Sequence, residues 1–136
     1  MDPLKTLHIS TAGMKVQGDR LRVIAENIAN ANATALTPGG APYRRKVITF
    51  ENVLDRELGV TTVRSNGTAF DRSPFGVRHD PGHPAADAEG NVLIPNVNPA
   101  LEMADMREAL RSYQANLGVI EASKTMVQRT LDILRR

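Results

Sequence analysis

Two heptad stripes, one at each end of the chain, predict a mainly α-helical protein with long terminal helices and a small β-rich insert. The N-terminal stripe consists of Leu4, Leu7, Thr11, Met14, Gly18, Leu21, Ala25 and Ile28. The C-terminal stripe consists of Met103, Met106, Leu110, Tyr113, Leu117, Ile120, Lys124, Val127, Leu131 and Leu134. Residues that alternate at steps of three and four lie along one narrow side of a helix, as in a supercoiled helix pair. The middle of the chain lacks this spacing.

Each terminal helix is expected to hold about 30 residues and to extend for roughly 45 Å. The segment between the two helices is too short to cover both of them. We therefore expect the apolar stripes to pack against copies of the chain or against its relatives. Gly18, on the first stripe, is either a defect that costs up to about 1 kcal/mol relative to alanine or a site of close helix approach.

Three segments follow from this pattern. Residues 1–36 are predicted to form an N-terminal core helix, residues 37–97 a linker with a small β-rich segment, and residues 98–136 a C-terminal core helix. The two helices are expected to form one core domain.

Both helix starts are marked by the same pair of residue types. Asp2-Pro3 and Asn98-Pro99 each place a capping side chain before a proline, which fits the first position of a helix. The first helix should weaken through the asparagine-rich run at residues 27–34 and end before Pro38.

Short strands are expected in the middle segment. Residues 43–50 alternate like a strand, and residues 60–64 and 68–70 are predicted to form a hairpin around an Asn66-Gly67 turn. Residues 75–79 and 91–94 are further strand candidates. Residues 50–59 could form one or two helical turns, and the sequence leaves this segment undecided.

Composition excludes several classes of protein. The 17 Lys and Arg residues nearly balance the 15 Asp and Glu residues, which argues against a general nucleic-acid-binding protein. No cysteine is present, so disulfides, thiolate metal sites and a cysteine nucleophile are excluded. The N-terminus does not resemble a secretory signal peptide, and no segment is apolar enough to span a bilayer. These features indicate the cytoplasm unless the protein is exported without a cleaved signal.

A metal site is the less favoured interpretation of a histidine-containing loop. His79, His83, Asp80 and Asp87 are residue types that can bind zinc. The HxxxH spacing brings two imidazoles together only on a helix, and Pro81 prevents a helix here. A loop stiffened by prolines is favoured, and we expect no metal and no cofactor.

A basic cluster, Arg44-Arg45-Lys46, follows Tyr43 and could contact phosphates or an anionic polymer. The favoured interpretation is the exposed side of a strand with an acidic neighbour such as Glu51. No glycine-rich phosphate loop and no spacing typical of a catalytic triad is present. The chain is therefore not expected to be an enzyme, and no catalytic residue is assigned.

Several segments resemble a known family. Residues 19–34, DRLRVIAENIANANAT, resemble the signature of bacterial flagellar axial proteins, which include rod, hook and hook-associated subunits. The segments TPGGAPYRRKVITFE, DPGHPAADAEGNV and PNVNPALEMADM resemble more specifically the C-type rod subunits of the basal body, the proximal rod proteins. The C-terminal segment EALRSYQANLGVIEASKTMVQRTLDI is similar to the same subunits.

The resemblance implies a structural protein. In this family, the terminal helices pair as an antiparallel coiled-coil core that lines an axial channel, and subunits stack into a helical tubular array that transmits torque. The implied partners are copies of the chain, proximal and distal rod proteins, the base of the rod at the MS ring and export gate, and the type III export apparatus. Nucleic acid and membrane insertion are not implied. Export without a cleaved signal peptide would place the protein in the rod that spans the periplasm.

An assembly interface is expected on the terminal helices and on the asparagine run that matches the family's motif. Its predicted residues are Leu7, Met14, Leu21, Asn27, Ile28, Asn30, Asn32, Met106, Leu110, Tyr113, Leu117, Ile120, Leu131 and Leu134. Two alternatives stay open: a periplasmic module that binds the cell wall, and a cytoplasmic coiled-coil adaptor. A pocket with convergent titratable groups would favour the first alternative.

Overall fold

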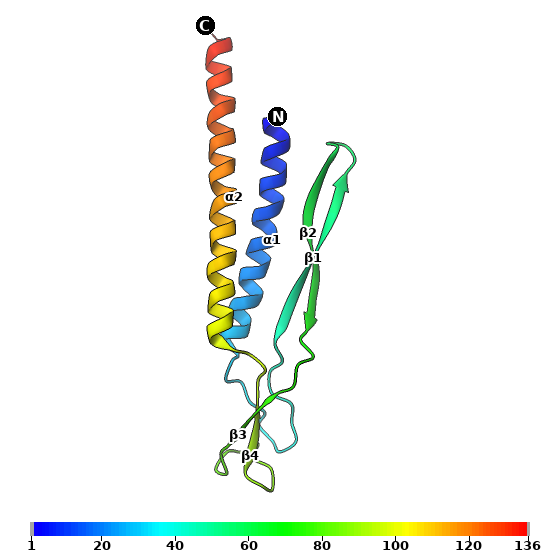
Figure 1. Ribbon diagram of the computed structural model, residues 1–136, viewed down its shortest axis with the longest axis vertical. Helices are drawn as coiled ribbons and strands as arrows, with labels where there is room; N and C mark the ends of the chain where they lie inside the picture. Colours follow the sequence, from blue (N-terminus) through cyan, green and yellow to red (C-terminus); the bar gives the residue numbers. More distant parts are fainter. Residues whose placement is uncertain (1, 136) are drawn as a thin grey trace. The chain divides into compact units, whose positions relative to one another are not determined.

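One helix at each end of the chain flanks four strands in the computed structural model, which describes residues 2–135 (Figure 1). The elements are α1 (Pro3–Ala29), β1 (Lys46–Asp55), β2 (Val60–Phe70), β3 (Gly76–His79), β4 (Asn91–Ile94) and α2 (Pro99–Leu134). The residues group into two compact units. Unit 1 contains Met1–Leu21, Ile48–Gly67 and Arg107–Arg136, and unit 2 contains Arg22–Val47 and Thr68–Met106.

Both predicted helix starts are confirmed. The Asp2 side chain accepts a hydrogen bond from the Leu4 N–H at 3.0 Å, and Asn98 accepts one from the Ala100 N–H at 3.0 Å. Each side chain thus satisfies an N–H group that has no partner inside its helix. No described helix contains a stretch long and apolar enough to cross a membrane.

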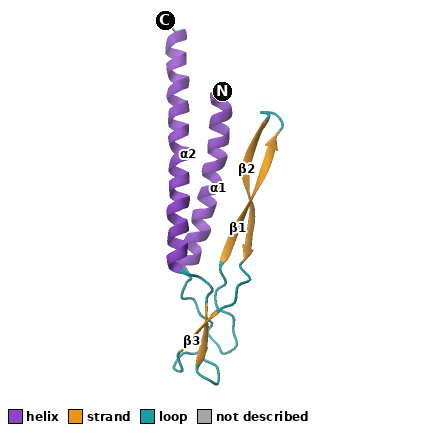
Figure 2. Cartoon of the chain, in the orientation of Figure 1, coloured by secondary structure: helices purple, strands orange, loops and turns teal. Residues whose placement is uncertain are grey.

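The prediction of a mainly α-helical fold with an antiparallel coiled-coil core is wrong. The terminal helices are present, but they account for only roughly half of the chain. A central antiparallel hairpin, β1–β2, and a second two-stranded sheet, β3–β4, fill much of the rest (Figure 2). The structure does not show the two helices interlocked as a coiled coil.

The reason is visible in unit 1, where α1 and α2 run in opposite directions. The buried row of α2 is displaced from the predicted stripe: where the stripe contains Leu110, the buried residue is the one before it, Ala109. Ala109 is 0% exposed whereas its neighbour Leu110 is 42% exposed. A coiled coil needs interlocking apolar side chains at its contact positions. Here small and polar residues occupy the buried row, so several leucines of the predicted stripe remain exposed.

The two helices come close together at Gly13. A Cβ atom built on Gly13 would lie 2.9 Å from Nδ2 of Asn116, so the absence of a side chain lets the helices come together here. Arg20 and Glu108 form an ion pair at 3.5 Å farther along the same contact. A Cβ atom on Gly18 would meet nothing within 4 Å, so close approach does not explain the glycine at that position.

The predicted position of the hairpin turn is also wrong. The chain reverses between β1 and β2, where the Asp55 carboxylate accepts hydrogen bonds from the N–H groups of Glu57 at 3.0 Å and Leu58 at 3.1 Å. Gly59 completes this turn with a φ of +62°, which glycine adopts without strain. Residues 51–55, which could have formed helical turns, continue β1 instead. Asn66 and Gly67 lie inside β2.

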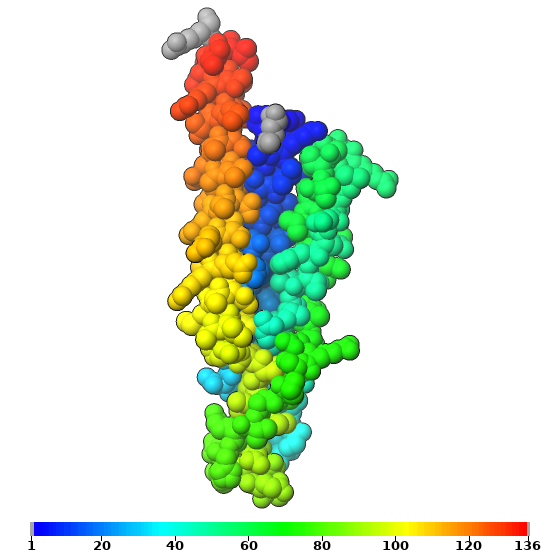
Figure 3. Space-filling view, viewed as in Figure 1, coloured from blue at the N-terminus to red at the C-terminus, as the bar shows by residue number. Residues whose placement is uncertain are grey.

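Within unit 1, polar contacts join the hairpin to α1. The Ser65 hydroxyl donates to the Asp19 carboxylate at 2.9 Å, and His8 lies 3.3 Å from the Asp55 carboxylate. Val16 is buried on the same helix. In the space-filling view, the last turns of α2 (red) extend beyond the start of α1 (blue) (Figure 3).

The two short strands of unit 2 are confirmed. β3 and β4 pair in antiparallel register, from Gly76 opposite Ile94 to His79 opposite Asn91. Val92 of β4 is completely buried and provides an apolar centre for this unit. The loop between the strands folds back through hydrogen bonds between the Asp87 carboxylate and the N–H groups of Glu89 and Asn91.

Candidate functional site

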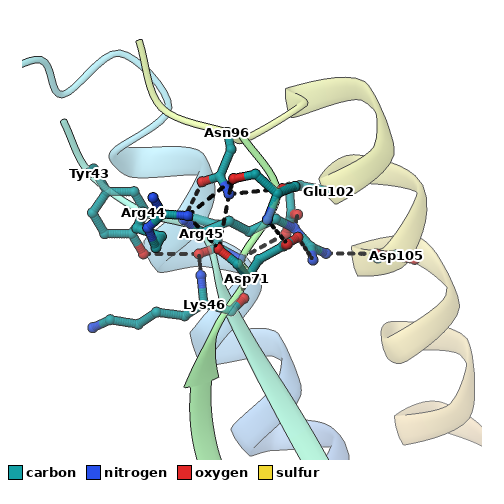
Figure 4. A network of polar contacts seen from close by, with 10 residues as sticks. Tyr43, Arg44, Arg45, Lys46, Asp71, Asn96, Glu102 and Asp105 are labelled. Carbon is teal, nitrogen blue, oxygen red and sulfur yellow. Dashed lines mark hydrogen bonds and ion pairs between the residues drawn. The ribbon is translucent and has the colours of Figure 1, made fainter. Parts of the chain in front are cut away.

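A cluster of eight polar residues in unit 2 joins segments that are far apart in the sequence, and Figure 4 labels seven of them together with Arg44. We call it the polar hub and define it as Asn27, Tyr43, Arg45, Lys46, Asp71, Asn96, Glu102 and Asp105. These residues come from the end of α1, the segment that leads into β1, the segments after β2 and β4, and the first turns of α2.

Asn27 lies at the centre of the polar hub and is only 1% exposed. Its amide nitrogen donates to the Lys46 carbonyl at 2.8 Å and to the Glu102 carboxylate at 3.2 Å. Its amide oxygen accepts from the Lys46 N–H at 2.9 Å and from the Tyr43 hydroxyl at 2.9 Å. A side-chain amide has two N–H donors and two acceptor positions, and all four are used here.

Glu102 is the second buried member and is also 1% exposed. One carboxylate oxygen accepts from Nε of Arg45 and the other accepts from Asn27. A buried carboxylate destabilises a fold unless a charged and hydrogen-bonded partner compensates for its lost hydration. Arg45 supplies this charged partner and so makes the burial of Glu102 possible.

Arg45 extends the network to two further carboxylates. Its guanidinium lies 3.3 Å from the Asp71 carboxylate and 3.8 Å from that of Asp105. Its backbone N–H donates to the Asn96 side chain at 2.8 Å. The Asn96 amide in turn donates to the Asp71 and Ser73 carbonyls, both at 3.2 Å. One arginine thus links the segment before β1, the segment after β2, the segment after β4 and α2.

These contacts shift the ionisation of hub residues. Burial disfavours the charged guanidinium of Arg45, but the hydrogen bond and charge of Glu102 outweigh it and raise its pKa. Hydrogen bonds from the backbone and side chain of Ser73 lower the pKa of Asp71. Burial, followed by the nearby charge of Glu26, raises the pKa of Tyr43. The hub is therefore built to hold Arg45 and Asp71 charged and Tyr43 neutral.

The interpretation of the basic cluster as the exposed side of a strand beside Glu51 is wrong. Glu51 accepts a hydrogen bond from Nε of Arg64 at 3.0 Å. Arg45 belongs to the hub, and the Lys46 ammonium pairs with Glu26 of α1. Arg44 donates to the carbonyls of Asp71 and Ser73, and its guanidinium lies 4.1 Å from the centre of the Phe75 ring.

His79, at the end of β3, and His83, in the loop that follows, make separate contacts. Nε2 of His83 lies 3.1 Å from the Thr34 hydroxyl, and its Nδ1 accepts from the Ala85 N–H at 3.0 Å. Nδ1 of His79 lies 3.4 Å from the Asn91 side chain. Among residues 2–135, no group of three or more His, Cys, Asp or Glu residues is arranged to hold a metal ion.

The predicted interface residues have different environments. Asn27 is buried in the hub, and the Asn30 amide donates to the Glu26 carbonyl at 2.9 Å. Asn32 is exposed. The half-buried members are Leu7, Met14, Leu21, Ile28, Met106, Tyr113 and Ile120. The exposed members are Leu110, Leu117, Leu131 and Leu134.

Two kinds of residue were not found from the sequence. The partners of Arg45 are 26 to 60 positions away in the chain, so the sequence around Arg45 does not indicate them. Glu102 drew no attention either, because a glutamate in the first turn of a helix is common and is explained by its favourable interaction with the helix dipole. The exposed residues Val119, Met126 and Ile133 lie outside the predicted stripe. Their own spacing of seven residues was a signal that could have revealed a second apolar row.

Known proteins similar to this chain are flagellar rod proteins. A family model for the C-terminal region of the flagellar basal body rod FlgEFG proteins matches residues 88–133. The flagellar basal-body rod protein FlgC of Agrobacterium fabrum is 51% identical over 99% of this chain and 98% of its own length. The proteins of the same name are 37% identical in Borreliella burgdorferi, over 99% of both chains, and 36% identical in Salmonella typhimurium, over 96% of both chains. The chain therefore belongs to the FlgC family of flagellar basal-body rod proteins.

Proposed function

We propose that the chain is a structural subunit of the proximal rod of the bacterial flagellar basal body and that the exposed apolar rows of α2 contact neighbouring subunits there. The observation that carries this proposal is the combination of family membership with large apolar side chains that the chain itself does not cover. Contiguous exposed apolar surface on a protein marks interaction sites.

Two apolar rows flank the buried row of α2 in unit 1. Leu110 and Leu117 lie on one flank, and Val119, Met126 and Ile133 lie on the other, seven residues apart. Residues seven apart in a helix lie on nearly the same side. α2 therefore offers apolar surface in two directions, which suits a subunit with neighbours on both sides. We name these five residues the flanking rows.

The end of α2 is apolar as well. Leu131 is 54% exposed and Leu134 is 77% exposed, in the last turns of α2. Burial of such side chains contributes roughly 1.5 to 3 kcal/mol each, so a few of them supply a large share of an interface. The partners that fit this surface are copies of the chain and other rod proteins.

The finer parts of the proposal rest on the family. The subunit transmits torque as part of a shaft and borders the channel through which later subunits pass. It is exported by the flagellar type III apparatus without a cleaved signal and resides where the rod crosses the periplasm, with the MS ring and export gate at its base. Its role is mechanical rather than catalytic, in keeping with relatives that are named as rod proteins.

A pair of substitutions on α2 tests the proposal. Leu117→Asp places a carboxylate in the flanking rows, where burial without a partner costs several kcal/mol, so we expect cells that make the subunit but do not swim. Thr125→Asp adds the same charge at an exposed polar position and should leave motility intact. The measurement is the amount of each variant in isolated basal bodies. Normal incorporation of Leu117→Asp would contradict the proposed interface, and absence of the parent protein from basal bodies would contradict the proposed function.

A further inference from the structure

We infer that the polar hub is a positioning clamp, in which Arg45 holds the first turn of α2 against the end of α1 and so fixes the relative placement of the two helix ends. The importance of this placement for assembly rests on the proposed function, because those helices carry the surfaces that neighbouring subunits would contact. The clamp itself is a property of unit 2 alone.

The chain distances between hub partners are the first argument. Asn27 and Lys46 are 19 residues apart, Arg45 and Glu102 are 57 apart, and Asn27 and Glu102 are 75 apart. No contact within a helix or a hairpin brings these groups together. Contacts over such separations form only when the distant segments of unit 2 are folded together. The hub therefore stabilises one arrangement of these segments.

The saturation of the hub is the second argument. Asn27 uses all of its hydrogen-bonding positions, and both oxygens of Glu102 have partners inside the chain. A displaced α2 would leave a buried carboxylate and a buried amide without partners. Buried polar groups in this state are costly, so one arrangement of the helix ends is favoured over its alternatives.

The location of Glu102 is the third argument. Glu102 is the fourth residue of α2, which begins at Pro99, and it lies in the first turn, where a carboxylate also interacts favourably with the helix dipole. The Arg45 guanidinium reaches Asp105, one turn later, at 3.8 Å. The arginine therefore contacts two successive turns of α2 and limits rotation of the helix as well as its translation.

A distance measurement within unit 2 tests this inference. The chain contains no cysteine, so Ala25→Cys on α1 and Ala104→Cys on α2, both at exposed positions, can be spin-labelled without background. In the purified full-length protein we expect a narrow distance distribution. Arg45→Met should replace it by a broad and shifted distribution, and Glu102→Gln should cause a smaller shift because its amide still accepts from Arg45.

Arg44→Met is the matched control, because Arg44 is the preceding arginine and contacts the Asp71 and Ser73 carbonyls and the Phe75 ring instead of Glu102. We expect this control to retain the narrow distribution. Slow amide exchange of β4 in Arg45→Met would show that the variant is still folded, so that a broad distance distribution reports the loss of the clamp alone. A narrow distribution in Arg45→Met, or a broad one in the parent protein, would overturn the inference. Rod incorporation of the same variants is a separate readout, so failure of the clamp is distinguished from failure of the proposed function.

Discussion

The polar hub in unit 2 and the flanking rows of α2 in unit 1 differ in whether their side chains have partners inside the chain. The hub contains amide, carboxylate and guanidinium groups, and it satisfies them through contacts inside the chain. The flanking rows are apolar and remain exposed, with Val119 at 41% and Met126 at 57%. A region with internal partners helps to specify the fold of the subunit, whereas an exposed apolar region is the one proposed to contact other molecules. The comparison separates the residues that shape the subunit from those that join it to its neighbours under the proposed function.

The largest effect is expected from Arg45→Ala, which leaves the buried Glu102 carboxylate without its cation. We expect a loss of about 3 kcal/mol in the free energy of unfolding, at the lower end for a broken buried ion pair because Arg45 is partly exposed. Urea denaturation of the full chain measures it. The double variant Arg45→Met with Glu102→Leu removes both charges and should lose much less. Equal losses in the two variants would show that the ion pair is not what the hub depends on.

A smaller loss is expected from Asn27→Asp, which keeps the size of the side chain but changes its hydrogen bonding. At neutral pH an aspartate cannot donate to the Lys46 carbonyl, and it would face the Glu102 carboxylate. We expect a destabilisation of about 2 kcal/mol from the lost bonds and the repulsion. Asn32→Asp, at an exposed position of the same run, is the control and should be close to neutral. A neutral Asn27→Asp would mean that the hub is not closed in solution.

Two glycines of α1 provide a sharper comparison within one helix. Gly18→Ala should stabilise the protein by up to about 1 kcal/mol, because alanine is the better helix former and the added Cβ meets nothing within 4 Å. Gly13→Ala should lose this gain, because its Cβ would lie 2.9 Å from Nδ2 of Asn116. Thermal unfolding of the two variants measures the difference. An equal gain at both positions would contradict the close approach of α1 and α2 at Gly13.

The smallest effect concerns pH. Since the folded state lowers the pKa of Asp71, this residue contributes stability above its unfolded pKa of about 3.9, and the contribution is lost as pH falls through the lower folded value. Unit 2 should therefore weaken at a pH below about 4. In Asp71→Asn the stability should be lower at neutral pH and should depend less on acid. Identical acid limbs in denaturation curves of parent and variant would count against this assignment.

Local signals in the sequence predicted the starts of both helices and the two short strands of unit 2. The Asp2-Pro3 and Asn98-Pro99 pairs gave both helix starts because capping depends on neighbouring residues only. The strands at residues 76–79 and 91–94 were predicted from their composition. The hairpin turn was misplaced because Asn66-Gly67 is a strong local signal that the capped turn after Asp55 overrides.

Features that depend on distant contacts could not be predicted. The heptad stripe located some of the apolar residues of α2, but it did not indicate that Asn116 would lie against Gly13 of α1. Likewise, nothing near Arg45 in the sequence indicates that its main partner is Glu102, 57 residues away. The resemblance to rod proteins predicted the family correctly without revealing the hub, because a family motif such as the asparagine run does not state what its side chains contact.

Hydrogen exchange of the full-length protein, free in solution and within isolated basal bodies, tests the contrast between the two regions most directly. The account predicts that backbone amides next to hub residues in unit 2 exchange slowly in both states. Amides in the last turns of α2, from Met126 to Leu134, should exchange rapidly in the free protein and become protected in the rod, because only there are Met126 and Ile133 of the flanking rows covered. Protection of this part of α2 in the free subunit, or unchanged rapid exchange in the rod, would contradict the account.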